Sequence, residues 1–138
     1  MTDIDLIAKK LAYIESCVRE LKTLAHPEAI RTDIRELRFI VYTLHTAIQA
    51  ALDAAAHIVS DERLGEPRTN RDLFEILVRN VWMPERLAEP LRRMVGFRNI
   101  AVHGYEVVDL AIVEDVVVYH LGDLLDFAQA IRERLARA

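Results

Sequence analysis

An arginine, a histidine and a tyrosine lie close together near residue 100, and their side chains could act on a phosphate. Arg98 is followed after four residues by His103, and Tyr105 comes two residues later. A guanidinium offers a planar fork of N–H donors that suits a phosphate. An imidazole can accept or donate a proton near neutral pH. The pair could cleave RNA without a metal or cofactor, with His103 moving protons and Arg98 stabilising the transition state. DNA lacks the 2′-hydroxyl that this route requires.

The spacing of these residues limits how they can cooperate within one helix. Asn99 and His103 are four residues apart and share a helix face, so Asn99 could orient the imidazole. Arg98 and His103 differ by about 140° on a straight helix. They can meet only near a helix end, across a distortion, or in a groove shared with a second protomer. Gly104 is well placed to end the helix, and the helix dipole would then favour a charged His103 by roughly 0.3–1 kcal/mol. The alternative is an ion pair and a cap with no catalytic role.

A row of polar residues recurs every four positions further upstream and forms a second candidate cluster. We call His45, Gln49, Asp53 and His57 the polar row. Asp53 and His57 have the spacing of helical metal ligands, but a polar seam within the bundle or a dimer is the favoured interpretation. Asp53 could instead point towards Arg98 and His103 and tune the histidine. The single cysteine, Cys17, can form no internal disulfide.

The elements that must position these residues are helices. Apolar residues make up 52% of the 138 residues and recur at intervals of three and four, as in Ile4, Ile7 and Leu11. This period predicts helices over residues 4–25, 34–60, 70–81, 84–103 and 109–135, separated by a loop at 61–69. Asp3 or Thr2, Thr32 or Asp33, and Asn70 are expected caps, and Pro84 an expected first helical residue. The sequence therefore predicts one all-α domain over residues 1–138, an antiparallel bundle of four to five helices. Broad apolar stripes predict a homodimer.

Composition and charge exclude several classes of protein. The chain contains no run of about 18 apolar residues, which a membrane span requires, and we expect no secretory signal. A cytoplasmic location is expected by default. The net charge of −4 argues against a nucleic-acid binder with a basic surface throughout. Residues 68–98, however, carry 7 basic and 4 acidic residues, directly before the candidate site.

The arrangement of Arg98, His103 and Tyr105 matches the RX4HXY motif of the HepT-like HEPN toxins. The resemblance continues on both sides of the motif. Residues 47–59 resemble the second helix of that family, and residues 64–67 with Phe74 and Leu77 resemble the entry to its third helix. The strings Phe97-Arg98-Asn99 and His103-Gly104-Tyr105-Glu106, followed by Val108-Asp109, resemble its signature helix and exit. The similarity covers roughly residues 4–135 and departs from the motif nowhere.

This resemblance implies a function, a partner and a set of site residues. It implies a homodimeric HEPN bundle in which Arg98 and His103 of both protomers line a cleft. The supporting roles expected of Asn99 and Asp53 rest on their positions in the sequence and not on the resemblance. The family's activity is metal-independent cleavage of cellular RNA, which halts growth. Its usual partner is MntA, a minimal nucleotidyltransferase antitoxin that can transfer AMP to the motif tyrosine, here Tyr105. Phosphates placed there would occupy the substrate site and repel RNA. A non-catalytic binding or acceptor subunit of a nucleotidyltransferase, and a structural dimerisation module, remain alternatives.

Overall fold

The protein folds into helices connected by short turns. The computed structural model describes residues 2–102 and 109–137, and for residues 99–102 it describes the backbone only. The elements in chain order are α1 (Ile4–Leu24), η1 (Pro27–Ala29), α2 (Ile34–Asp61), α3 (Asn70–Arg79), η2 (Glu85–Leu87), α4 (Ala88–Val102), α5 (Leu110–Asp115), η4 (Val116–His120) and α6 (Leu121–Ala136). The described ranges contain no strand, and the predicted all-α fold is confirmed.

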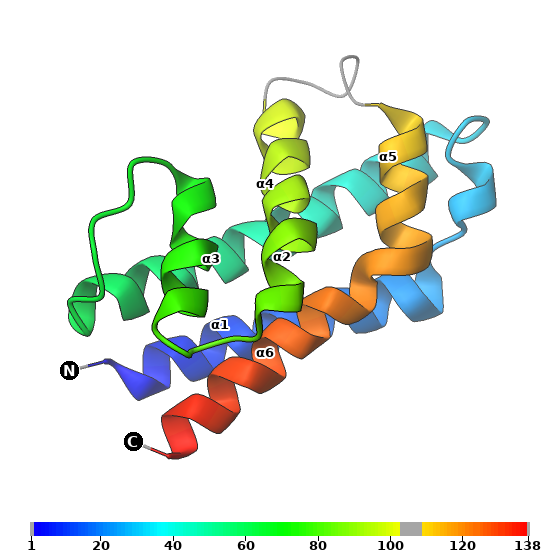
Figure 1. The fold of residues 1–138 in the computed structure, drawn as a ribbon. Helices are drawn as coiled ribbons and strands as arrows, with labels where there is room; N and C mark the ends of the chain where they lie inside the picture. The colour runs from blue at the N-terminus through cyan, green and yellow to red at the C-terminus, as the bar shows by residue number, and fades with distance from the viewer. Residues whose placement is uncertain (1, 103–108, 138) are drawn as a thin grey trace.

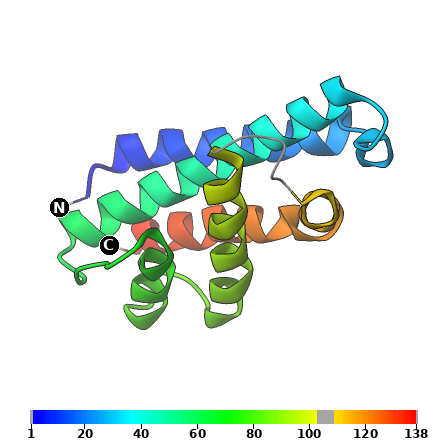
Figure 2. The same cartoon turned by 90° about the horizontal axis from the view of Figure 1, so that it is seen from above.

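Three long helices form the body of the molecule, and two shorter ones cross it. α1 and α2 run antiparallel as a hairpin, and α6 lies against both of them (Figures 1 and 2). α3 and α4 stand side by side across α2, and the upper end of α4 approaches the middle of α2 (Figure 1). The predicted helical bundle is confirmed. None of the helices in the described ranges combines the length and the apolar composition of a membrane span.

Short polar side chains begin the helices, mostly where the sequence predicts. The Asp3 carboxylate accepts from the Leu6 N–H at 3.1 Å and begins α1, and Asp33 caps α2. The prediction that Asn70 caps α3 is wrong, because Thr69 holds that position and Asp72 accepts from the Thr69 N–H at 3.3 Å. With Thr69 as the cap of this capping box, α3 begins at Asn70, one residue earlier than a cap at Asn70 would imply.

The link between α3 and α4 also differs from the prediction. α3 ends at Arg79 rather than near Val81, whose backbone adopts a left-handed conformation with φ of 62°. Pro84 is not the first residue of a long helix; it precedes the single 3₁₀ turn η2, and α4 begins only at Ala88. Pro90 lies in the first turn of α4, where its missing N–H leaves no helical hydrogen bond unmade.

Large apolar side chains from all parts of the chain fill one core. Phe74 of α3 and Phe127 of α6 meet edge to face, with ring centroids 5.7 Å apart, and both are almost fully buried. Trp82, between α3 and α4, is also buried, and the Arg134 guanidinium lies 4.6 Å from the centre of its ring. Trp82 is therefore an anchor of the bundle.

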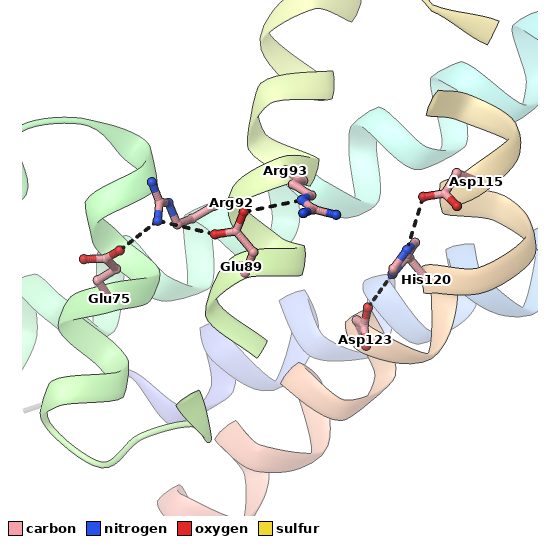
Figure 3. Close-up of polar contacts among 7 residues, drawn as sticks. All are labelled: Glu75, Glu89, Arg92, Arg93, Asp115, His120 and Asp123. Atoms are coloured by element: carbon pink, nitrogen blue, oxygen red, sulfur yellow. Dashed lines mark hydrogen bonds and ion pairs between the residues drawn. The ribbon is translucent and has the colours of Figure 1, made fainter. Parts of the chain in front are cut away.

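The C-terminal segment turns a corner where the sequence predicts one continuous helix. α5 ends at Asp115, a π-helical turn spans Val116–His120, and α6 continues in a different direction (Figure 1). His120 joins the two sides of this corner, with its ring nitrogens 3.2 Å from an oxygen of Asp115 and 2.9 Å from one of Asp123 (Figure 3). The continuous helix over 109–135 is thus corrected to two helices and a π turn.

Charged side chains fasten α4 to its neighbour α3. The Arg92 guanidinium lies 3.2 Å from Glu75 of α3 and 3.5 Å from Glu89 of α4 (Figure 3). Arg93 reaches the same Glu89 at 3.4 Å. These pairs are exposed and contribute little individually, whereas the buried Leu91, Met94 and Val95 fix the helix to the core.

Candidate active site

The position of Arg98 is set by the apolar face of α4. Val95 and Phe97 are buried in the core. Arg98 is half-buried beside them, on the side of α4 that faces α2. Its Nε–H donates to the side-chain oxygen of Gln49 on α2, with an N–O distance of 2.9 Å. The structure therefore joins the motif arginine directly to the polar row.

Two further hydrogen bonds extend this contact across the hairpin. The Gln49 amide nitrogen donates to one oxygen of Asp53 at 2.8 Å. The Lys10 ammonium of α1 donates to the other oxygen of Asp53 at 3.2 Å. The side chains of Lys10 and Asp53 are 32% and 37% exposed, so water partly screens this pair. Arg98, Gln49, Asp53 and Lys10 form a hydrogen-bonded chain through α4, α2 and α1, which we call the arginine chain.

His45 lies one turn before Gln49 on α2 and is affected by the same arginine. Burial, and then the positive charge of Arg98, lower the pKa of His45 below its ordinary value of 6.5. The Nδ1 atom of its ring is buried and has no hydrogen-bond partner among the described residues. His45 is therefore a neutral imidazole beside Arg98 at neutral pH.

Two other residues singled out from the sequence, His57 and Cys17, are not part of the arginine chain. His57, the last residue of the polar row, is exposed. Within the described part of the chain, no three His, Cys, Asp or Glu side chains are grouped so that they could hold a metal ion. Cys17 is buried between α1 and α2, 3.8 Å from the Thr46 hydroxyl, and burial raises the pKa of its thiol.

Three predicted site residues are placed only in part or lie outside the described residues. The backbone of Asn99 belongs to α4, one residue after Arg98. His103 and Tyr105, and with them the expected stop at Gly104, lie outside the described residues. Asp53, predicted as a supporting residue, is connected to Arg98 through Gln49 rather than by direct contact.

Sequence reasoning missed Lys10 as part of the site. Lys10 sits beside the apolar stripe of α1, next to the buried Leu11, and nothing in its own sequence context distinguishes it from Lys9. Its partnership with Asp53 depends on the register in which α1 packs along α2. Only knowledge of how α1 packs along α2 could have identified Lys10 as part of the site.

Known proteins of similar sequence and structure agree on one family. Residues 11–131 match the family model described as ribonuclease HepT-like. The mRNA nuclease HepT of Shewanella oneidensis is 33% identical over 129 residues, which cover 93% of this chain and 97% of that protein. The crystal structure of a toxin–antitoxin with AMP-PNP superposes with a TM-score of 0.87 at 32% identity, over 94% of this chain and 98% of that one.

A second solved structure carries a modification. The tri-AMPylated HEPN toxin of Shewanella oneidensis in complex with MNT antitoxin has a TM-score of 0.84 and 33% identity, over 96% of this chain and 99% of that one. The α-helical fold is therefore that of a HEPN protein. The chain belongs to the ribonuclease HepT-like family, and the resemblance identified from the sequence is confirmed.

Proposed function

We propose that this protein is a metal-independent endoribonuclease, the toxin of a toxin–antitoxin pair that cleaves cellular RNA. The observation that carries the proposal is the half-buried Arg98, held on a rigid helix five residues before His103, in a chain of the ribonuclease HepT-like family. Its relative in Shewanella oneidensis is an mRNA nuclease. The basic excess of residues 68–98 comes directly before the rest of the motif in the sequence.

The chemistry needs only an arginine and a proton carrier. His103 takes the proton from the 2′-hydroxyl of the RNA while the 2′-oxygen attacks phosphorus, or it donates a proton to the departing 5′-oxygen. The Arg98 guanidinium binds the phosphate oxygens and stabilises the charge that develops on them in the transition state. The bond between phosphorus and the 5′-oxygen breaks, which cuts the strand. Asn99 orients His103, and Asp53 supports Arg98 through Gln49.

A homodimer completes this site in the proposal. On a straight helix Arg98 and His103 point about 140° apart, so residues of two protomers facing one cleft would bring a guanidinium and an imidazole to the same phosphate. The arginine chain fixes the guanidinium at the surface between α2 and α4, from which such a cleft could be built.

The proposed antitoxin is an MntA-like nucleotidyltransferase that modifies Tyr105. The hydroxyl of Tyr105 would attack the α-phosphate of ATP, forming a phosphodiester to AMP and releasing pyrophosphate. A phosphate on Tyr105, seven residues after Arg98, would pair with the guanidinium and exclude RNA. The tri-AMPylated neighbour in complex with MNT antitoxin supports this regulation.

The same neighbour favours one alternative, in which the protein is only the acceptor subunit of a nucleotidyltransferase. Expression in bacteria separates the two. The proposal predicts growth arrest and fragmented total RNA with the wild-type protein, and neither effect with His103→Ala at equal expression. Co-expression of a cognate nucleotidyltransferase should restore growth. Intact RNA and normal growth with the wild-type protein would favour the acceptor subunit.

A further inference from the structure

The arginine chain includes a residue to which the proposed chemistry gives no role, Gln49. We propose that Gln49 is the positioning residue of the nuclease: its side-chain oxygen fixes the plane of the Arg98 guanidinium, and Asp53 and Lys10 fix the direction in which that oxygen points. The inference rests on the proposed function, since it concerns how the phosphate-binding arginine is held. Three hydrogen bonds of 2.9, 2.8 and 3.2 Å carry it.

The orientation of the Gln49 amide follows from its two neighbours. A carboxylate only accepts hydrogen bonds, and a guanidinium only donates them. Asp53 therefore takes the amide N–H, which turns the amide oxygen towards the Nε–H of Arg98. The reversed amide would set oxygen against carboxylate and N–H against guanidinium, two repulsive contacts. Lys10 holds the second oxygen of Asp53 and keeps that carboxylate on the α1 side.

A neutral amide next to Arg98 has a consequence that a carboxylate would not have. A carboxylate in direct contact would offset the positive charge of the guanidinium and compete with phosphate for its N–H groups. Gln49 orients the guanidinium without itself offsetting the positive charge. The negative charge of Asp53 lies one residue further along the arginine chain and is itself opposed by Lys10 at 3.2 Å. The contact with Gln49 therefore places no negative charge directly beside Arg98.

A guanidinium that is held in place before the substrate binds increases the rate of cleavage as well as the affinity for the phosphate. An arginine has many rotamers, and ordering one of them on the phosphate costs free energy that a preorganised side chain does not lose at that moment. A catalytic group misplaced by about 1 Å can lose on the order of 100-fold in rate. We therefore expect variants that misdirect Arg98 to fold normally and cleave slowly.

The sharpest test exchanges the two functional groups of α2. The double variant Gln49→Glu/Asp53→Asn keeps the total charge, keeps each side chain's length, and permits a hydrogen bond at every link from Arg98 to Lys10. It moves only the negative charge, from residue 53 to residue 49, which is the position in contact with Arg98. Because a carboxylate in contact with Arg98 offsets the charge that stabilises the transition state, we expect the kcat for RNA cleavage to fall on the order of 100-fold, with a melting temperature within about 4 °C of wild type.

A second variant and one reference protein complete the experiment. Gln49→Met keeps the side-chain length, places no charge beside Arg98 and lacks the oxygen, so its kcat should also fall. If both variants cleave RNA with the wild-type kcat, Gln49 only joins two helices and the inference is wrong. Arg98→Ala, measured in parallel, separates this result from a failure of the proposed function. An active Arg98→Ala would refute the nuclease role of the arginine, whereas an inactive one beside active Gln49 variants would refute only the positioning role.

Discussion

Replacing Arg98 by lysine keeps its positive charge and removes its geometry. The guanidinium donates through Nε to Gln49 at 2.9 Å, and its planar shape can define the direction of a bound phosphate. An ammonium is a single point of charge on a flexible stem and has no fixed plane. Removing one donor that stabilises a transition-state anion costs about 100- to 1000-fold in rate. We expect Arg98→Lys to lose at least the lower of these factors.

The stability cost of the same change should be small. The hydrogen bond to Gln49 is lost, and a hydrogen bond of a charged group is worth about 1.5–3 kcal/mol, against a total stability of roughly 5–15 kcal/mol for a domain. For a chain of this length about 1 kcal/mol lowers the melting temperature by about 4 °C. The variant should therefore remain folded at 25 °C, and its slow cleavage should reflect the site.

A matched control lies on the same helix. Arg93→Lys changes an exposed arginine of α4 whose described contact is an ion pair with Glu89 at 3.4 Å. Initial rates of cleavage of a fluorescent RNA, measured together with thermal unfolding, should be unchanged in Arg93→Lys and strongly reduced in Arg98→Lys. Cleavage by Arg98→Lys at the wild-type rate would show that charge alone suffices, and the geometric reasoning would be refuted.

Three further predictions concern acid stability, the core and the attacking group. Because the pKa of His45 is lowered in the folded protein, the unfolded chain binds a proton more readily than the folded one, and the free energy of unfolding should fall as the pH drops below 6.5. In urea unfolding, His45→Gln should lessen this fall. The same pH dependence in the variant and the wild type would contradict the prediction. Phe127→Ala removes a fully buried ring packed on Phe74 and should cost about 3–5 kcal/mol in the same assay; a loss typical of a surface substitution would contradict it. An RNA with one 2′-deoxyribose at a cut position should resist cleavage at that bond alone; an undiminished cut there would exclude attack by the 2′-hydroxyl.

The helices were predictable because the spacing of apolar residues along the sequence indicates which face of each helix is buried. The stripe that begins with Ile4, Ile7 and Leu11 places α1, and Asp3 and Asp33 are local caps that act within a few residues. The corner at Val116–His120 could not be seen in the same way. The apolar spacing continues through the π turn, and the change of direction depends on how α5 and α6 pack against the rest of the molecule.

The site was predictable only as a set of residue types. The four-residue interval placed His45, Gln49 and Asp53 on one helix face, and a polar seam on that face is what the structure contains. The link from Gln49 to Arg98, and from Asp53 to Lys10, depends on the contacts between α2 and two other helices. How one helix is aligned against another cannot be deduced from the spacing of residues within a single helix.

The most direct test of the account is cleavage of RNA by the purified protein in the presence of EDTA. The wild-type protein should cleave, Arg98→Ala and His103→Ala should not, and all three should unfold at similar temperatures. Cleavage that persists in both variants would contradict the central claim that a guanidinium and an imidazole act together on one phosphodiester.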